Sequence, residues 1–258
     1  MYRYELHCHE NLINWCARWT PEEMVKAYSD LGYTGIVVTD HFFNNPSCKI
    51  SSELSWREKV EQFYAGYERT KEEGDKYGLD VFFAFEYSAN SYYMEDLSSL
   101  GEKNSKDLIE KNDLRGCDFL IYGLGKEWLL NKDESILKLS VNDFMKMVKE
   151  EGGTVIQAHP FRLERSYMDH ISLFPNYTDG VEIINGSPNT IGRSNRLAKA
   201  YAEEYGFFFT AGTDAHSITE HLAVTDLEER VSSVDELIAA LKSGKAKLSL
   251  EKNPLYRT

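Results

Sequence analysis

The sequence lacks the features that mark several specialised classes of protein. No apolar run approaches the roughly 20 residues needed to span a bilayer, and no basic-then-apolar pattern stands at the amino terminus. The four cysteines form no Cys-x-x-Cys pair and indicate no disulfide framework. Internal repeats and low-complexity linkers are also absent. These absences predict a cytoplasmic protein without a membrane partner.

Positive charge is scarce in this chain. Lysine and arginine number 29 against 42 aspartates and glutamates, so the formal net charge is −13. Long nucleic acid is therefore not an expected partner, because neutralising its phosphates requires a surplus of basic side chains. A small anionic substrate remains compatible, because bound divalent cations reverse the local field. The sequence does not indicate an oligomeric state.

Apolar runs alternate with helical stretches along the whole chain. At 258 residues the chain could form one sizeable core or two small domains, and we predict a single domain over residues 1–258. The alternation predicts an α/β fold with a parallel barrel or a doubly wound sheet. Strands are expected at 2–6, 34–39, 80–86, 119–123, 154–158, 180–184 and 207–211.

The helices have recognisable start and stop signals. The stretch TPEE at residues 20–23 has the form of a capping box, with proline at the first helical position. That helix should end near Leu31, with Gly32 as its stop. Other helices are expected at 56–77, from Ser140 to Gly152-Gly153, at 189–205 and in the first part of 234–250, which should finish as an edge strand. Long connections at 44–55, 88–115 and 160–178 should shape a site.

Chemistry-bearing residues follow the strands. In parallel α/β folds, the carboxyl ends of the strands converge on one face, where active sites are built. Such residues occur at strand ends as His7 and His9, Asp40 and His41, Glu86, His159, and Asp214 and His216.

These residue types are the ligands that zinc, manganese and iron accept. Taken singly, each motif has an ordinary reading, such as an incidental His-x-His or a turn aspartate. Their joint arrival at strand ends predicts a metal site. Several histidines in one desolvated pocket would be unfavourable without an ion, whereas neutral imidazoles are good ligands.

The ordered motifs resemble one family. His-x-His, Thr-Asp-His, a lone Glu after the third strand, His-Pro and Gly-Thr-Asp-x-His appear in sequence from His7 to His216. They are similar to those of the PHP (polymerase and histidinol phosphatase) metallo-phosphoesterases, in particular the histidinol-phosphatase-like branch. The resemblance covers nearly the whole chain and implies a distorted (β/α)7 barrel, like a TIM barrel, with its metal site at the carboxyl ends of the strands.

The resemblance also implies a role for each residue in a centre of two or three zinc, manganese or iron ions. One ion would be held by a set of four residues, of which Glu86 would bridge to a second ion on His159. His41 and His216 would bind a third ion. Asp40 would be a supporting carboxylate that positions an imidazole or a water. The set of four comprises His7, His9, Glu86 and Asp214.

Two positions depart from the family pattern. Many members have Asp or His five or six residues after His-x-His, where this chain has Asn14 and Trp15, and Glu10 is a possible substitute. A histidine is also usual near the fourth strand. There we favour Asp118 as the ligand. An alignment that places the ligand after the strand would instead put it at Gly125, which has no ligating side chain.

Such a centre predicts hydrolysis of a phosphate ester by a metal-activated water. Arg162, three residues after His159, is the best candidate to clamp the phosphate, although it could instead be a surface arginine. The leading hypothesis is an enzyme that acts on a small-molecule phosphomonoester. The alternatives are a phosphodiesterase acting on short oligonucleotides and a metal-binding or sensing module without turnover.

Overall fold

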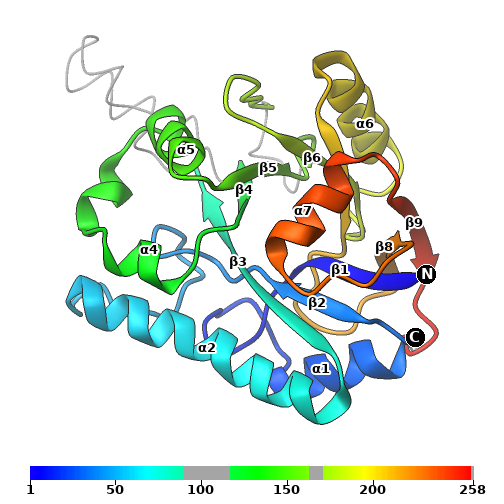
Figure 1. Cartoon of the computed structure of the whole chain (residues 1–258), viewed down its shortest axis with the longest axis horizontal. Coiled ribbons are helices and arrows are strands. Elements are labelled where there is room, and N and C mark those ends of the chain that lie inside the picture. Colours follow the sequence, from blue (N-terminus) through cyan, green and yellow to red (C-terminus); the bar gives the residue numbers. More distant parts are fainter. Residues whose placement is uncertain (90–116, 163–170, 257–258) are drawn as a thin grey trace.

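The chain forms one strongly curved mixed sheet surrounded by helices. The computed structural model describes residues 1–89, 117–162 and 171–256 (Figure 1). Strands follow the spatial order β7-β6-β5-β4-β3-β2-β1-β8-β9. Their bounds are β1 Tyr2–Cys8, β2 Gly35–Val38, β3 Asp80–Ser88, β4 Asp118–Tyr122, β5 Thr154–Ala158, β6 Gly180–Asn185, β7 Phe208–Gly212, β8 His221–Leu227 and β9 Lys247–Lys252.

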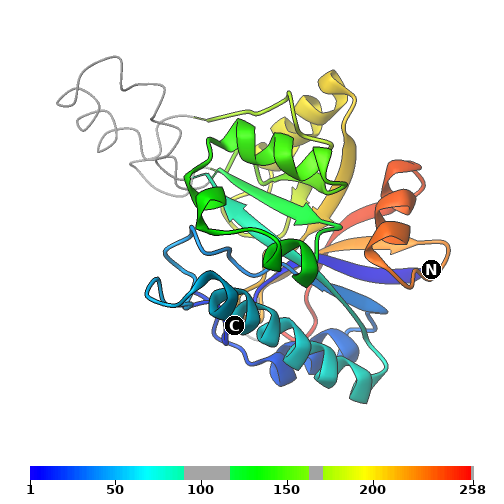
Figure 2. The ribbon, with the colours of Figure 1, turned by 60° about the vertical axis from the view of Figure 1, so that its left-hand side comes forward.

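The helices lie mainly around the outside of the sheet, while α7 lies in front of the strands in the view of Figure 1 (Figures 1 and 2). They are α1 Pro21–Asp30, α2 Trp56–Tyr77, α4 Lys126–Leu130, the 3-10 turn η2 Glu134–Lys138, α5 Val141–Glu150, α6 Arg193–Tyr205 and α7 Val234–Lys242. No helix of the described segments combines the length and apolarity that crossing a membrane requires.

The predicted capping signals are confirmed where the structure describes them. Thr20 accepts a hydrogen bond from the Glu23 amide, and the Glu23 carboxylate accepts one from the Thr20 amide. Ser140 caps α5 as expected. The predicted helix at 189–205 begins later, at Arg193. Most of the predicted connection 88–115 and part of 160–178 lie outside the described residues.

All seven predicted strands are present, but the expectation of a wholly parallel sheet is wrong. Strand β4 runs antiparallel to both β3 and β5. Strand β8, which was not predicted, runs antiparallel to β1 and β9. The pattern of apolar residues indicates which segments are buried strands but not the direction of each strand. That direction depends on the segments that connect the strands.

The curved sheet nearly closes into a barrel, so the predicted distorted barrel is confirmed. Strand β7 contacts β1 and β8, although the hydrogen-bonded order puts it at the far edge. Beyond β7, the Asp214 amide donates to the His7 carbonyl at 2.8 Å, and the His9 amide donates to the Ala215 carbonyl at 3.0 Å. The first and seventh strands therefore meet at the residues that carry the predicted ligands.

Close approach at this seam requires glycine at position 212. A Cβ built there would lie 2.4 Å from the His7 Cβ and 2.5 Å from Glu182 Oε1. Such distances are far below van der Waals contact, so any larger residue would displace both side chains.

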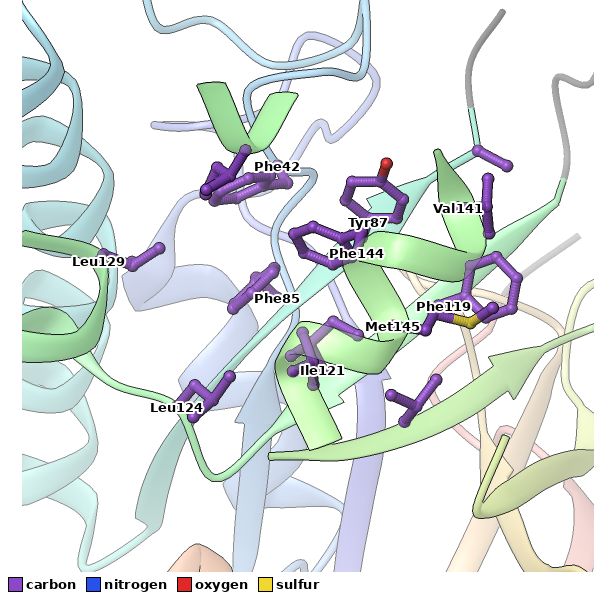
Figure 3. Packing of buried hydrophobic residues seen from close by; sticks show 14 of the residues in the cluster. Phe42, Phe85, Tyr87, Phe119, Ile121, Leu124, Leu129, Val141, Phe144 and Met145 are labelled. Atoms are coloured by element: carbon purple, nitrogen blue, oxygen red, sulfur yellow. The ribbon is translucent and has the colours of Figure 1, made fainter. Parts of the chain in front are cut away.

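The outer face of β3 packs against helices. Phe85 and Tyr87 belong to a buried aromatic cluster with Phe42 and Phe144 (Figure 3). The rings of Tyr87 and Phe144 stack with centroids 3.8 Å apart. Because successive strand residues alternate between faces, Glu86 points to the inner face of the sheet.

An irregularity in β1 re-aims its side chains. Tyr4 and Leu6 belong to a cluster to which β1 through β5 all contribute, whereas Cys8 packs against α1 residues. Residues two apart in a regular strand share a face, and the shift in pairing between Glu5 and Cys8 breaks that rule. Cys8 is therefore a packing residue, and His7 and His9 face inward.

Candidate metal centre

The structure brings the predicted metal-ligating side chains together at one end of the barrel. Four groups of three side chains each have ligand atoms within 4.8 Å of one another. These groups contain His7, His9, His41, Glu86, Asp118, His159, Asp214 and His216, together with Glu182.

His7 and His9 share two carboxylates. The His7 Nε2 lies 3.3 Å from Glu86 Oε1 and 3.4 Å from Asp214 Oδ1. The His9 Nε2 lies 3.4 Å from Glu86 Oε2 and 3.3 Å from Asp214 Oδ1. Both histidines are fully buried. Two imidazoles and two carboxylates thus converge on one point.

His159 and Asp118 extend this cluster on the side of β4. The His159 Nε2 lies 3.4 Å from Glu86 Oε1 and 3.8 Å from Asp118 Oδ2. Asp118 is the first residue of β4, and the antiparallel direction of that strand places its start beside the ends of β3 and β5. Gly125 follows β4 at the opposite end of the strand, away from the cluster.

His41 and His216 lie beside His9 nearer to solvent. The centroid of the His9 ring is 4.5 Å from that of His41 and 4.3 Å from that of His216. The His41 Nδ1 lies 2.8 Å from Glu86 Oε2. The His216 Nδ1 is 3.0 Å from the carbonyl of Asp214. The Nδ1 atom of each ring is thus engaged, and its Nε2 atom is available to bind a metal ion.

Glu182, which the sequence reasoning missed, supports two of the histidines. Its carboxylate lies 3.0 Å from the His7 Nδ1 and accepts the His159 amide at 3.0 Å. It also accepts the Asn185 side-chain amide at 2.9 Å. This contact favours a proton on the Nδ1 of His7 and leaves its Nε2 toward the cluster. The sequence feature that could have indicated Glu182 is the presence of a glutamate inside the otherwise apolar run GVEII.

Glu5 is a second missed carboxylate. It accepts the amides of His7 and Thr213, each at 2.8 Å, and the Tyr28 hydroxyl at 3.2 Å. Burial raises the pKa of Glu5 to about 7, although these hydrogen bonds oppose the rise. Glu5 therefore ties β1 to the segment that carries Asp214.

Asp40 lies beside the cluster and faces away from its ligand atoms. Its carboxylate accepts the Glu10 amide at 3.1 Å and the side-chain amide of Asn14. Burial and the charge of Glu10 raise the pKa of Asp40 well above its usual value. Asn14 in turn accepts the His41 amide at 2.9 Å. Asp40 thus holds the loop that precedes α1 through these hydrogen bonds.

Cys16 lies at the mouth of the centre. Its exposed thiol lies near the imidazoles of His41 and His216. Burial opposes its ionisation, but these two histidines outweigh that effect and lower the pKa of the Cys16 thiol to about 6. The sequence reasoning did not single out this residue.

Arg162 points into the centre. Its guanidinium pairs with Asp214 and lies 3.8 Å from Asp118 Oδ2. Its side chain is 12% exposed. The alternative partners Glu164 and Asp169 lie outside the described residues. The Arg162 guanidinium is therefore a cation fixed beside the acidic groups of the cluster.

The charges of the centre are strongly coupled. Burial opposes a charge on His7, but carboxylates led by that of Asp214 hold its pKa well above the usual value. Burial also opposes ionisation of Glu86, yet His41 and His7 hold the pKa of Glu86 well below its usual value. Burial and the neighbouring Glu86 raise the pKa of Asp118.

Two residues of the cluster adopt left-handed backbone conformations. The φ angles are +28° for His159 and +56° for Asp214, and among the described residues no other non-glycine residue has a positive φ. Such conformations are uncommon for residues other than glycine, although less so for Asp and His, and they persist where the surroundings fix them. Strain of this kind is typical of functional sites.

The donor set fits divalent metal ions. The Nε2 atoms of His7, His9 and His159 are buried without a hydrogen-bond partner. Buried polar groups without partners are costly in proteins. Imidazole and carboxylate donors around a common centre are the ligands that zinc, manganese and iron accept.

Comparisons with known proteins agree with the fold. Residues 192–246 match the model of the PHP-associated family, PHP_C. No curated protein matches the chain in sequence. A two-domain protein of Bacteroides vulgatus ATCC 8482, containing a predicted PHP-like metal-dependent phosphoesterase, has a similar structure. Its TM-score is 0.63 at 13% identity, covering 96% of this chain and 64% of that one.

A candidate metal-dependent phosphoesterase from Bifidobacterium adolescentis ATCC 15703 is similar at a TM-score of 0.50 and 14% identity. That likeness covers 93% of this chain and 96% of the other. The family match over residues 192–246 agrees with the resemblance to the PHP superfamily, and the structural likeness shows a shared fold. The chain spans 64% of the Bacteroides protein. Placement in the histidinol-phosphatase-like branch stays a prediction.

Proposed function

We propose that this protein is a metal-dependent phosphoesterase that hydrolyses a small-molecule phosphomonoester. The observation that carries the proposal is the buried cluster of histidines and carboxylates at one end of the barrel, with Arg162 against it. The similarity to proteins described as PHP-like metal-dependent phosphoesterases supports this class of hydrolase.

The residues divide into an inner and an outer set. The inner set would hold one or two ions, with Glu86 between His7 and His9 on one side and His159 on the other. The outer set, His41 and His216, would hold a further ion. When bound, divalent ions of this kind lower the pKa of a water and neutralise phosphoryl oxygens.

The remaining side chains of the centre hold and orient the candidate ligands. Glu182 holds His7 with its Nε2 directed inward, and Glu5 fixes the backbone on both sides of the seam. Asp40 holds Asn14, which holds the backbone of His41. Asp40 is thus a positioning residue.

Arg162 is placed to bind the substrate. Its guanidinium lies against Asp214 and Asp118, so it would be within reach of a phosphate bound by metal ions at those carboxylates. A planar guanidinium matches a phosphate with two parallel hydrogen bonds. The net charge of −13 supports a small substrate over a long polyanion.

A substrate panel tests this proposal. Protein loaded with manganese or zinc should release inorganic phosphate from monoesters faster than it cleaves a dinucleotide. Faster cleavage of the dinucleotide would favour a phosphodiesterase instead. Failure of a fully metallated preparation to hydrolyse any monoester or diester would leave a metal-binding module without turnover.

A further inference from the structure

Asn185, the last residue of β6, lies behind the carboxylate that supports two histidines of the inner set. Its side-chain nitrogen donates to Glu182 Oε2 at 2.9 Å. The Glu182 carboxylate in turn contacts the His7 ring at Nδ1 and accepts the His159 backbone amide, each at 3.0 Å. A single side-chain amide is therefore one hydrogen bond away from the contacts that hold both histidines.

A bulge in β6 brings Asn185 onto the same face as Glu182. Residues three apart in a regular strand point to opposite faces of the sheet. In β6, Glu182 and Ile184 lie opposite two adjacent residues of β7, so Ile183 is an extra residue in the pairing. Bulges of this kind re-aim side chains and are common next to active sites. The bulge thus directs the Asn185 side chain toward the metal centre.

The neighbours of Asn185 fix the direction of its amide group. Its Oδ1 accepts the Ser187 backbone amide at 3.0 Å, and a backbone N–H can only donate. The Thr190 hydroxyl lies 2.9 Å from the same oxygen. The nitrogen must therefore face Glu182 and donate to it. Because the side chain is fully buried, it is placed to act on Glu182 and not on a substrate.

Helix α6 holds the backbone of Asn185 from the other side. The Asn185 backbone amide donates to Asn195 Oδ1, and the Asn195 side-chain amide donates to the Asn185 carbonyl, each at 3.1 Å. Asn195 lies in the first turn of α6. The position of Asn185 is thus fixed by α6, and its side chain is free of any other task than to hold Glu182 and the following turn.

We propose that Asn185 is a positioning residue for the inner metal-binding set and acts through Glu182. Its donation to Oε2 leaves Oε1 directed at the Nδ1 of His7, so that the Nε2 of His7 faces the cluster. Through the same carboxylate it holds the backbone of His159. The inference rests on the proposed metal-dependent function and adds a residue that contacts neither metal nor substrate.

Asn185→Asp tests this role with the smallest change of shape. One oxygen can still accept the Ser187 amide, but the other would lie against Glu182, and two carboxylates repel each other. Partners of metal-binding histidines contribute about 10- to 100-fold to metal affinity. Above neutral pH, we expect Asn185→Asp to weaken binding of one equivalent of zinc by about tenfold. The matched control is Asn189→Asp, which adds the same charge at an exposed position nearby and should bind zinc normally.

A double-variant cycle shows whether Asn185 acts through Glu182. Glu182→Gln should itself weaken zinc binding. Adding Asn185→Asp to it should then cost less than about twofold, because the repulsion between carboxylates is gone. An unchanged zinc affinity in Asn185→Asp, or the same tenfold loss in both backgrounds, would overturn the inference.

The tautomer of His7 supplies a measurement that does not depend on how these variants fold. In zinc-loaded protein labelled with ¹⁵N-histidine, nuclear magnetic resonance should show His7 protonated at Nδ1 and bound to metal through Nε2. Loss of the signal in His7→Gln assigns it. Asn185→Asp should shift this signal, whereas Asn189→Asp should not.

The outcomes separate this inference from the proposed function. Coordination of zinc through Nδ1 of His7, or a His7 signal that Asn185→Asp leaves unmoved, would overturn the inference and leave the phosphoesterase proposal standing. Failure of the unaltered protein to bind zinc would overturn both.

Discussion

At the scale of single residues, the centre depends on side chains that hold the ligands as much as on the ligands themselves. Glu182 contacts His7 and the backbone of His159, and Glu5 joins the backbones of His7 and Thr213. Most ligand candidates were predictable because they lie at or near the ends of predicted strands in recognisable motifs. Their supports were not, because Glu5 and Glu182 lie within β1 and β6, beside register shifts that the residue pattern does not indicate.

Replacing Arg162 tests substrate binding at this scale. Arg162→Ala should reduce kcat/KM by about 100-fold, the size of effect seen when one donor to a developing charge is removed. Arg162→Lys should recover only part of the loss, because an ammonium does not reproduce the two parallel hydrogen bonds. Metal content should not fall. Steady-state kinetics check this, and Arg193→Ala, which changes an exposed arginine, is the control. If the two alanine variants had the same kcat/KM, the proposed role of Arg162 would be contradicted.

The charge coupling predicts how metal binding depends on pH. The pKa values of His7 and His41 are raised, so these rings keep their protons above their ordinary pKa of 6.5 in the metal-free protein. Metal must displace those protons, because imidazole coordinates in its neutral form. Affinity should therefore continue to rise with pH above 6.5. Calorimetry in buffers of different ionisation enthalpy should detect proton release, and pH-independent affinity without release would contradict this account.

At the scale of elements, strand direction decides which residues reach the centre. The antiparallel β4 presents its first residue, Asp118, where its parallel neighbours present their last. The sequence predicted the position of this strand within a residue but not its direction, because an apolar run of five residues is compatible with either. No element was predicted for the segment that forms β8, His221–Leu227.

Helix α2 controls the loop that carries Asn14. A Cβ on Gly66 would lie 2.5 Å from Ile13 Cγ1 and 2.9 Å from Glu10 Oε1. Gly66→Ala should therefore lower the free energy of unfolding by about 1–3 kcal/mol through overpacking, despite the better helix propensity of alanine. It should also weaken the outermost metal position. Denaturant unfolding would check this, with Gln62→Ala on the exposed face as the control; equal stabilities would contradict the packing argument.

At the scale of the whole molecule, barrel closure assembles the centre from both ends of the chain. His7 and His9 come from the first strand, and Asp214 and His216 follow the seventh, joined by backbone hydrogen bonds across the seam. The motif order predicted this convergence, since a barrel is the simplest way to bring such distant segments together. The single-domain organisation and the small substrate remain predictions.

The central claim is that the cluster supports metal-dependent hydrolysis of a phosphate ester. The most direct measurement is phosphate release from a monoester by chelator-treated protein as zinc or manganese is restored, with bound metal determined on the same samples. We predict no release without metal, release that rises in step with bound ions, and release absent in Asp214→Asn. Turnover that is unchanged by the chelator, or absent from a fully metallated protein, would contradict the account.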